Sequence, residues 1–161
     1  MGEPLVGLGL DVHPADPNRP LFLAGVRFEG VPGLAGHSDG DVVCHALADA
    51  LLGSAGLGDL GDHFPEADPA YEGIAGLDLL SRVGAMLTDR QLVARRCDVT
   101  ILADRPSIAP VRDEMRRNLA AALSVSIDDV SVKATRPEGL GLTGDGAACI
   151  AVVTVVPFGS R

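Results

Sequence analysis

The segment HSDGDVVCHALADALLG, residues 37–53, decides how the rest of the chain is interpreted. Its polar first residues predict a helix start capped by Ser38 or Asp39, because short oxygen-bearing side chains accept hydrogen bonds from the free N–H groups of a first turn. Gly53 stands near the expected helix end. One face is apolar and consists of Val43, Leu47, Ala50 and Leu51. Another face carries acid and imidazole groups at positions i, i+4 and i+8, namely Asp41, His45 and Asp49.

Short apolar stretches on both sides of this helix predict strands. Residues 5–10 form one strand, which Asp11-Val12-His13 follows directly, and residues 21–28 form another, with Gly25 marking a bend or bulge. The remaining patterns predict a loop over 56–71, a helix over 74–87, a strand over 93–102, a helix over 107–123, a turn over 126–129, a strand over 130–135, a glycine-rich loop over 136–146 and a strand over 148–156.

This order of elements predicts a single α+β domain over residues 1–161. We expect a mixed β-sheet with helices packed on one face. The other face of that sheet needs a cover, and association with further copies of the chain is the simplest one.

The charge balance argues against a nucleic-acid-binding protein. Thirteen Lys and Arg stand against 22 Asp and Glu, so the formal net charge is −9, and Lys133 is the only lysine. Phosphate contacts need clustered cations, and base stacking needs aromatic rings, which make up only 3% of the residues.

The sequence also lacks the patterns of membrane insertion and secretion. No apolar run reaches the roughly 18 residues of a membrane-spanning helix, and the first residues carry no basic signal-peptide region. We therefore expect a cytoplasmic protein. The three cysteines, Cys44, Cys97 and Cys149, are interpreted as buried reduced thiols.

Three residues have the chemistry of a metal site. Asp11 and His13 are two positions apart, so on a strand their side chains point to the same face. His45 lies near the acid-rich helix start and has no apolar reason to be there. Asp, His and His with one open position are typical of catalytic zinc. A loop histidine and a hydrogen-bonded core histidine fit the same spacing, which does not decide between the two interpretations.

Three further polar segments can contact an anionic or hydroxylated ligand. His37 beside Ser38 can bind a phosphate at the helix start, although helix capping explains the neighbouring acids. The acidic segment 58–65 can hydrogen-bond a polyol or simply be solvated. The segment 133–141 can hold diphosphate oxygens, and Mg²⁺ through Glu138, although glycine-rich loops are common.

Taken together, these motifs resemble one family closely. The motifs are GLDVH at 9–13, HSDGDxxxH at 37–45, GDLGxxFP at 58–65 and GLGLTG at 139–144. They are similar to those of 2-C-methyl-D-erythritol 2,4-cyclodiphosphate synthases of the non-mevalonate isoprenoid (terpenoid) pathway. The resemblance covers essentially the whole chain, without the cytidylyltransferase half of fused versions. It implies a homotrimer whose active sites lie between neighbouring subunits.

The resemblance also implies the reaction and its ions. The substrate would be 4-diphosphocytidyl-2-C-methyl-D-erythritol 2-phosphate, whose 2-phosphate attacks the β-phosphorus so that a cyclic diphosphate closes and CMP leaves. Such an enzyme is a phosphorus–oxygen lyase. By the family's pattern, Asp11, His13 and His45 would hold Zn²⁺, with Mn²⁺ as an alternative. Glu138 would hold Mg²⁺ on the substrate's phosphates.

The family's pattern further implies three sets of site residues. The catalytic residues would be His37 and Arg136. Substrate contacts would come from Asp11, Val12, His13, His37, Ser38, Asp59, Leu60, Gly61, Leu142 and a flexible lid of Phe64, Pro65, Glu66, Ala67 and Asp68. The nucleotide pocket, supplied by the neighbouring subunit, would consist of Ala103, Asp104, Arg105, Pro106, Ser107, Ile108, Ala109, Ala134 and Thr135.

A few positions depart from the family's pattern. Arg136-Pro137 replaces two threonines, so Arg136 either makes a stronger, charge-assisted contact to the transferred phosphate or is misplaced and lowers the rate. Ser107 and Asp145 stand where the family commonly has Lys and Arg. Two other functions therefore stay open: a zinc-dependent phosphohydrolase, and a catalytically weakened trimeric nucleotide-binding homologue.

Overall fold

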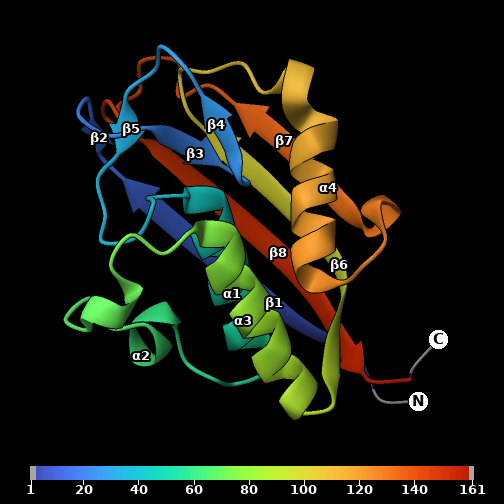
Figure 1. Cartoon of the computed structure of the whole chain (residues 1–161). Helices are drawn as coiled ribbons and strands as arrows, with labels where there is room; N and C mark the ends of the chain where they lie inside the picture. Colours follow the sequence, from blue (N-terminus) through green and yellow to red (C-terminus); the bar gives the residue numbers. More distant parts are fainter. Residues whose placement is uncertain (1–2, 160–161) are drawn as a thin grey trace.

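The structure, a computed structural model, describes residues 3–159 and contains one main sheet of four strands. Its strand order is β1-β8-β6-β7, and helices cover one of its faces (Figure 1). β8 runs antiparallel to both β1 and β6, whereas β7 runs parallel to β6. The strands are β1 (Leu5–His13), β6 (Leu92–Leu102), β7 (Val130–Thr135) and β8 (Ala147–Pro157), and the covering helices are α1 (Val42–Ser54), α3 (Gly76–Asp89) and α4 (Arg112–Leu123). The predicted mixed sheet with helices on one face is confirmed.

Shorter elements surround the sheet. Two small ribbons form from β2 (Ala15–Asp16) with β5 (Gly33–Leu34), and from β3 (Leu21–Leu23) with β4 (Val26–Phe28). The short helices are α2 (Leu60–His63), η1 (Pro69–Tyr71), η2 (Ala109–Val111) and η3 (Ile127–Asp129).

Several boundaries differ from those expected. Residues 21–28 form a hairpin instead of one bulged strand, because Ala24 and Gly25 both take left-handed φ angles, 49° and 73°, and reverse the chain. The expected loop 56–71 contains α2 and η1, and the expected turn 126–129 contains η3. The expected helices 74–87 and 107–123 lie at 76–89 and 112–123, and the first strand extends to His13.

The start of α1 is fixed by Asp41 and not, as expected, by Ser38 or Asp39. The fully buried Asp41 carboxylate accepts hydrogen bonds from the N–H groups of Val43 and Cys44, at 3.1 and 3.2 Å. It also accepts from the N–H groups of Ala24 and Gly25, at 2.9 and 2.8 Å. One side chain therefore caps α1 and attaches the β3–β4 hairpin to it.

Two glycines bring α1 unusually close to β1. A Cβ atom on Gly9 would lie 1.8 Å from the carbonyl oxygen of Ala46, and one on Gly7 would lie 1.8 Å from that of Ala50. Any side chain at these positions would push the helix off the strand. The close approach places His45 of α1 beside the polar end of β1.

The face of the sheet opposite the helices exposes apolar side chains. Val6, Leu8, Leu10 and Val12 of β1 are 66%, 69%, 61% and 56% exposed, and Ile150 and Val152 lie on the same face of the neighbouring β8. Such a stripe is larger than scattered surface residues explain and is typical of an interaction surface.

Other expectations concern the cysteines and the membrane. All three cysteines are buried and free, as predicted, and burial raises the pKa of Cys97 to about 12. Within residues 3–159, no helix combines the length and the apolar character needed to cross a membrane.

We predict that Gly9→Ala lowers the free energy of unfolding by more than about 2 kcal/mol, because the new Cβ overlaps the backbone of α1. Urea denaturation measures the change. Gly53→Ala is the matched control: it lies in α1 with open space around its Cβ position, so alanine should stabilise by up to about 1 kcal/mol. Equal stability of wild type and Gly9→Ala would contradict the packing argument.

Candidate active site

Asp11, His13 and His45 come together as one cluster. The Asp11 carboxylate oxygen Oδ2 lies 2.9 Å from His13 Nε2 and 3.1 Å from His45 Nδ1. The three donor atoms all lie within 4.8 Å of one another. Two imidazoles and one carboxylate this close fit a divalent cation such as zinc, and they leave a coordination position for another ligand. His45 is buried and has a hydrogen-bond partner at both ring nitrogens, Asp11 at Nδ1 and Ser38 Oγ at Nε2, the latter at 2.9 Å, as expected of a hydrogen-bonded core histidine.

The electrostatics of the cluster keep Asp11 ionised. Burial alone would raise the pKa of Asp11, but hydrogen bonds from His13 and His45 and their positive charge lower it well below its usual range. The hydrogen bond to Asp11 in turn raises the pKa of His13. The cluster therefore presents an anionic carboxylate between two imidazoles, and a bound cation would take the place of the ring protons that face Asp11.

The His37–Ser38 segment lies beside the cluster, and hydrogen bonds from Arg19 to its backbone hold it in place. Arg19 donates hydrogen bonds to the carbonyl oxygens of Gly36 and Ser38. The Nε2 atom of His37 is buried and has no hydrogen-bond partner within the described residues. A buried polar atom without a partner is costly, so this nitrogen is available to a ligand.

A cavity of about 200 Å³ joins the cluster to the segment after α1. Of the residues expected to contact substrate, it is lined by Asp11, His13, His37, Ser38, Leu60, Gly61, Phe64 and Glu66. It is also lined by Asp49, Tyr71, Ile74 and Leu79, which sequence reasoning did not assign to a site. Asp49 stood four residues after His45, and that spacing was the signal that could have identified it.

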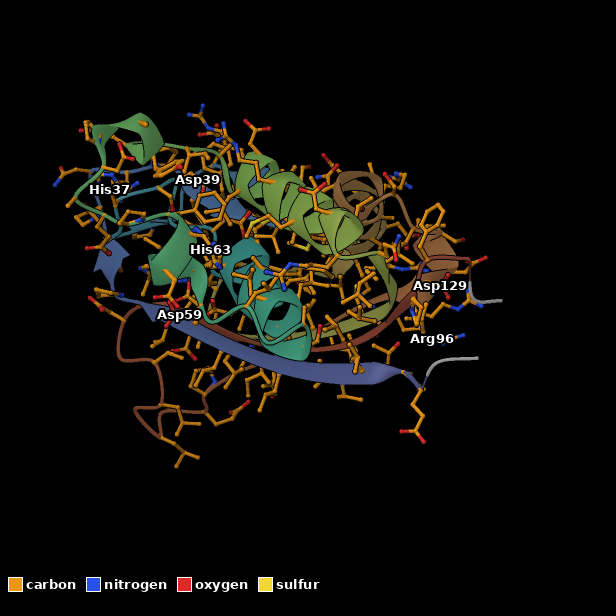
Figure 2. All side chains as sticks on the ribbon, turned by 90° about the horizontal axis from the view of Figure 1, so that it is seen from below. His37, Asp39, Asp59, His63, Arg96 and Asp129 are labelled. Carbon is orange, nitrogen blue, oxygen red and sulfur yellow. The ribbon has the colours of Figure 1, made fainter. Side chains whose placement is uncertain are left out.

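The segment expected to bind the substrate's hydroxyl groups forms the short helix α2, which has hydrogen-bonded caps. Asp59 caps α2 by accepting from the N–H of Asp62 at 3.1 Å, and Asp62 accepts from the N–H of Asp59 at 3.3 Å. Beyond it, the rings of Phe64 and Tyr71 meet edge to face at 5.1 Å between centroids. Figure 2 shows Asp59 and His63 at the same end of the molecule as His37. Pro65, Ala67 and Asp68 continue this segment, and Asp68 caps η1.

The expected nucleotide residues form a second pocket of about 210 Å³. It is lined by Ala103, Asp104, Pro106, Ser107, Ile108, Ala109, Ala134 and Thr135, together with Arg112 and Arg136. Arg112 was not expected, because nothing in its own segment marks it as a ligand contact. Arg136 gives this pocket a positive charge. Ser107, which stands where the family commonly has a lysine, gives it none.

Eight expected residues line neither cavity. Four of them lie on the segment around α2 and η1, namely Asp59, Pro65, Ala67 and Asp68. Val12 points its side chain to the uncovered face of the sheet, and Arg105 lines a separate hollow with Asp145. Glu138 and Leu142 are exposed on the segment after β7 and do not join the Asp11 cluster. Within one chain the structure therefore does not bring Glu138 to the metal ligands.

The two cavities lie at the same end of the sheet but on opposite edge strands. His13 of β1 pairs with Ala147, and the adjacent rung aligns Ala148, Leu102 and Thr135 of β8, β6 and β7. Three strand spacings of about 4.8 Å separate β1 from β7 by roughly 14 Å. The cavities share no lining residue.

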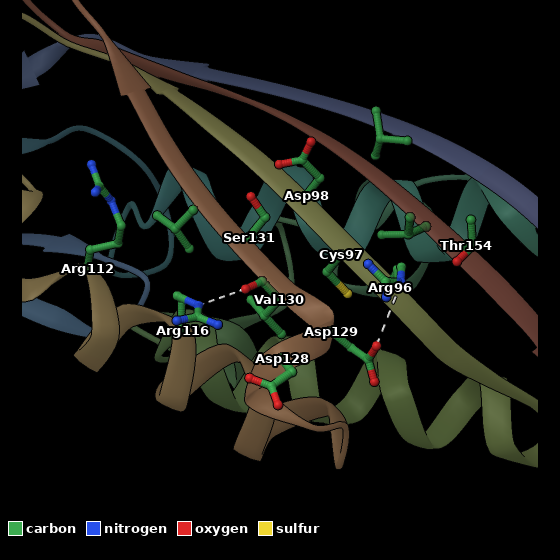
Figure 3. A pocket seen from close by; sticks show the side chains of 13 residues that line it. Arg96, Cys97, Asp98, Arg112, Arg116, Asp128, Asp129, Val130, Ser131 and Thr154 are labelled. Atoms are coloured by element: carbon green, nitrogen blue, oxygen red, sulfur yellow. Dashed lines mark hydrogen bonds and ion pairs between the residues drawn. The ribbon is translucent and has the colours of Figure 1, made fainter.

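A further hollow of about 600 Å³ lies along β6 and β7 (Figure 3). Two of its three arginines, Arg96 and Arg116, already have partners, and the third, Arg112, also lines the second pocket. Arg116 donates to the carbonyl oxygens of Val130 and Ile127, and Arg96 lies 3.8 Å from Asp129. Figure 2 shows Arg96 and Asp129 at the end of the molecule opposite to His37. We therefore assign no part of the site to this hollow.

Comparison with known proteins gives consistent matches. A family model described as the YgbB family matches residues 5–156. A 2-C-methyl-D-erythritol 2,4-cyclodiphosphate synthase of Symbiobacterium thermophilum is 48% identical over 153 residues, covering 94% of this chain and 98% of that protein. A bifunctional enzyme IspD/IspF of Anaeromyxobacter dehalogenans is 50% identical over 152 residues, covering 93% of this chain, which spans only 39% of that relative.

A solved structure shares the fold. It is a 2C-methyl-D-erythritol-2,4-cyclodiphosphate synthase in its CDP-bound form, with a TM-score of 0.86 and 31% identity. The match covers 94% of this chain and 99% of the solved one.

We predict that His45→Ala weakens Zn²⁺ binding at least about 100-fold, because it removes one of three ligands. Zinc content after dialysis, measured by mass spectrometry of the element, gives the result. His63→Ala is the matched control, since His63 bonds to the Leu57 carbonyl outside the cluster and should leave the zinc content unchanged. Full zinc retention by His45→Ala would refute the assignment of the cluster.

Proposed function

The chain belongs to the YgbB family, and from this premise we propose how it performs the reaction of a 2-C-methyl-D-erythritol 2,4-cyclodiphosphate synthase. The resemblance stated from the motifs is confirmed, and the synthase function in isoprenoid biosynthesis follows from the family. The observation that carries the mechanism is the Asp11–His13–His45 cluster in the wall of the first cavity.

The reaction is an intramolecular phosphoryl transfer. An oxygen of the 2-phosphate of 4-diphosphocytidyl-2-C-methyl-D-erythritol 2-phosphate forms a bond to the β-phosphorus. The bond from the β-phosphorus to the oxygen bridging the two phosphates breaks, and CMP leaves with that oxygen. The enzyme is then a phosphorus–oxygen lyase. The nucleophile is already an anion, so the site needs alignment and charge neutralisation more than a general base.

We assign the metal ligands to Asp11, His13 and His45, with Zn²⁺ as the expected ion and Mn²⁺ as an alternative. Glu138, from the exposed segment after β7, is proposed as the ligand of a Mg²⁺ ion that arrives with the substrate's diphosphate. When bound, these cations neutralise phosphate charge and polarise the phosphorus under attack.

Further residues in the first cavity and on nearby segments are proposed to orient the substrate. His37, with its free Nε2, and Ser38 contact phosphate oxygens. The Asp59 carboxylate and the backbone of Leu60 and Gly61 receive the methylerythritol hydroxyls. The segment Phe64, Pro65, Glu66, Ala67 and Asp68 covers the bound substrate and excludes water, and Leu142 adds an apolar contact.

The second pocket is proposed to bind the cytidine nucleotide. Its walls come from the end of β7 and from the segment between β6 and α4, where small side chains such as Ala134 and Ala109 leave room for a ring. Arg136 lines the same pocket and is assigned to the transferred phosphate, in place of the family's threonine. A guanidinium binds phosphate oxygens through two parallel hydrogen bonds, so it can substitute for a hydroxyl contact.

We propose that each complete site forms between two copies of the chain in a homotrimer. The metal cluster and the nucleotide pocket lie on opposite edge strands, so one copy can place its pocket beside the cluster of the next. The exposed apolar stripe of β1 and β8 supplies the surface that sheets of three copies would bury around an axis.

A cytoplasmic location stays a prediction.

Product analysis distinguishes this function from the two alternatives. We expect the purified, zinc-loaded protein to convert the substrate to the cyclic diphosphate and CMP, seen by ³¹P NMR, and chelator treatment to abolish turnover until metal is restored. A linear phosphate product would support the phosphohydrolase. Binding of CDP without turnover would support the weakened homologue.

A mixing experiment tests both Arg136 and the shared site. We predict that Arg136→Ala lowers kcat/KM about 100-fold, as loss of a transition-state contact does, and that His45→Ala is inactive. Trimers refolded from equal amounts of the two variants should regain about a quarter of wild-type activity. Each site takes its metal cluster from one copy and its nucleotide pocket from the next, and with random mixing about one site in four receives an intact cluster and an intact pocket. Full activity of Arg136→Ala alone would refute its role, and no regain on mixing would refute the shared site.

A further inference from the structure

Asp49 links the metal-ligand helix to the segment that receives the substrate's hydroxyl groups. Its Oδ1 accepts a hydrogen bond of 2.8 Å from the N–H of Leu60, the first residue of α2. Asp49 stands on α1 one turn after His45, and both residues line the cavity of the metal cluster. A single side chain thus connects two parts of the site that are distant in sequence.

The hydrogen bonds around α2 show what this contact adds. The Asp59–Asp62 capping bonds are internal to α2 and hold its shape, but they do not attach it to the rest of the protein. The Leu60–Asp49 bond reaches across to α1. Leu60 packs against the core but is only partly buried, and α2 has no fully buried side chain, so this hydrogen bond adds a directional contact that fixes where α2 starts.

The surroundings of Asp49 are unfavourable for a carboxylate kept only for stability. Burial raises the pKa of Asp49, and the nearby charges of Asp59 and Asp11 raise it further, whereas the Leu60 N–H lowers it. Three acids, Asp11, Asp49 and Glu66, line this small cavity, and the charge of Asp59 also acts on Asp49. An acid retained at such a place points to a role in the site.

We propose that Asp49 is a positioning residue: it anchors the start of α2 to the helix that carries His45, and so fixes Asp59, Leu60 and Gly61 at the distance from the metal cluster that the methylerythritol moiety requires. The proposal rests on the synthase function for its substrate. It assigns Asp49 no contact with the reacting atoms.

The test compares Asp49→Ala with Asp49→Asn, whose amide oxygen can still accept the Leu60 N–H. For Asp49→Ala we expect the Leu60 amide to exchange with deuterium roughly tenfold faster. We also expect KM to rise about tenfold, with kcat changed less than about threefold. Asp49→Asn should restore most of both values, and CDP affinity and zinc content should match wild type in each variant.

Asp62→Ala is the control, because it opens the capping box of α2 but keeps the bond between Leu60 and Asp49. It should change KM far less than Asp49→Ala. Unchanged Leu60 exchange or unchanged KM in Asp49→Ala would overturn the proposal. So would an Asp49→Asn variant as impaired as Asp49→Ala, since charge and not the hydrogen bond would then matter. Absence of turnover in wild type would instead count against the synthase function, while the exchange data would still show whether Asp49 anchors α2.

Discussion

The contact between the backbones of α1 and β1 is the constraint on which the site depends. Gly7 and Gly9 have no side chain, so the carbonyl oxygens of Ala50 and Ala46 occupy the space where Cβ atoms would lie. Strand residues alternate between faces, so Asp11 and His13 extend the same face as these glycines toward the end of β1. The residue of α1 that meets them is His45, whose Nδ1 lies 3.1 Å from Asp11. The metal cluster is therefore a consequence of how closely one helix packs on one strand.

A second buried carboxylate sets where that helix begins. Asp41 accepts four backbone N–H groups, two from α1 and two from the β3–β4 hairpin, and no apolar residue could satisfy them. The neighbouring Asp39 accepts from the N–H groups of Asp41 and of Gly76 at the start of α3. The acids of the HSDGD motif thus join three elements by hydrogen bonds: the start of α1, the β3–β4 hairpin and the start of α3. His37 and Ser38 of the same motif are left to face the cavity, which explains why capping and ligand binding coexist in one short segment.

Much of this arrangement could be predicted from the sequence, and the failures have physical causes. The spacing of Asp11 and His13 was enough to place them on one face of β1, β6 was recognisable from Cys97, Val99 and Ile101 alternating with polar residues, and β8 was recognisable as an apolar run. The cap was misassigned because Ser38, Asp39 and Asp41 are all good capping residues, and only the tertiary contacts to Ala24 and Gly25 favour Asp41. The helix α2 was missed because four residues carry no helical periodicity, and its anchor on Asp49 is a long-range contact. Glu138 lies apart from Asp11, His13 and His45 in one chain, and the proposed trimer is what would bring it to another chain's cluster.

The charge of the chain explains why these contacts must be so well defined. A protein of net charge −9 repels an anionic substrate at long range, so attraction has to arise locally. In the proposed mechanism its local sources are the nitrogens of His13, His37 and His45, the cations assigned to these residues and to Glu138, and Arg112 and Arg136 on the second pocket. Local fields of this kind act over a few ångströms, because salt screens exposed charges beyond a distance of about 10 Å. A site that lies between copies of the chain can place both groups of positive charge around the same phosphates, whereas in one copy they remain on opposite edges of the sheet. Assembly and charge neutralisation are therefore two aspects of the same requirement.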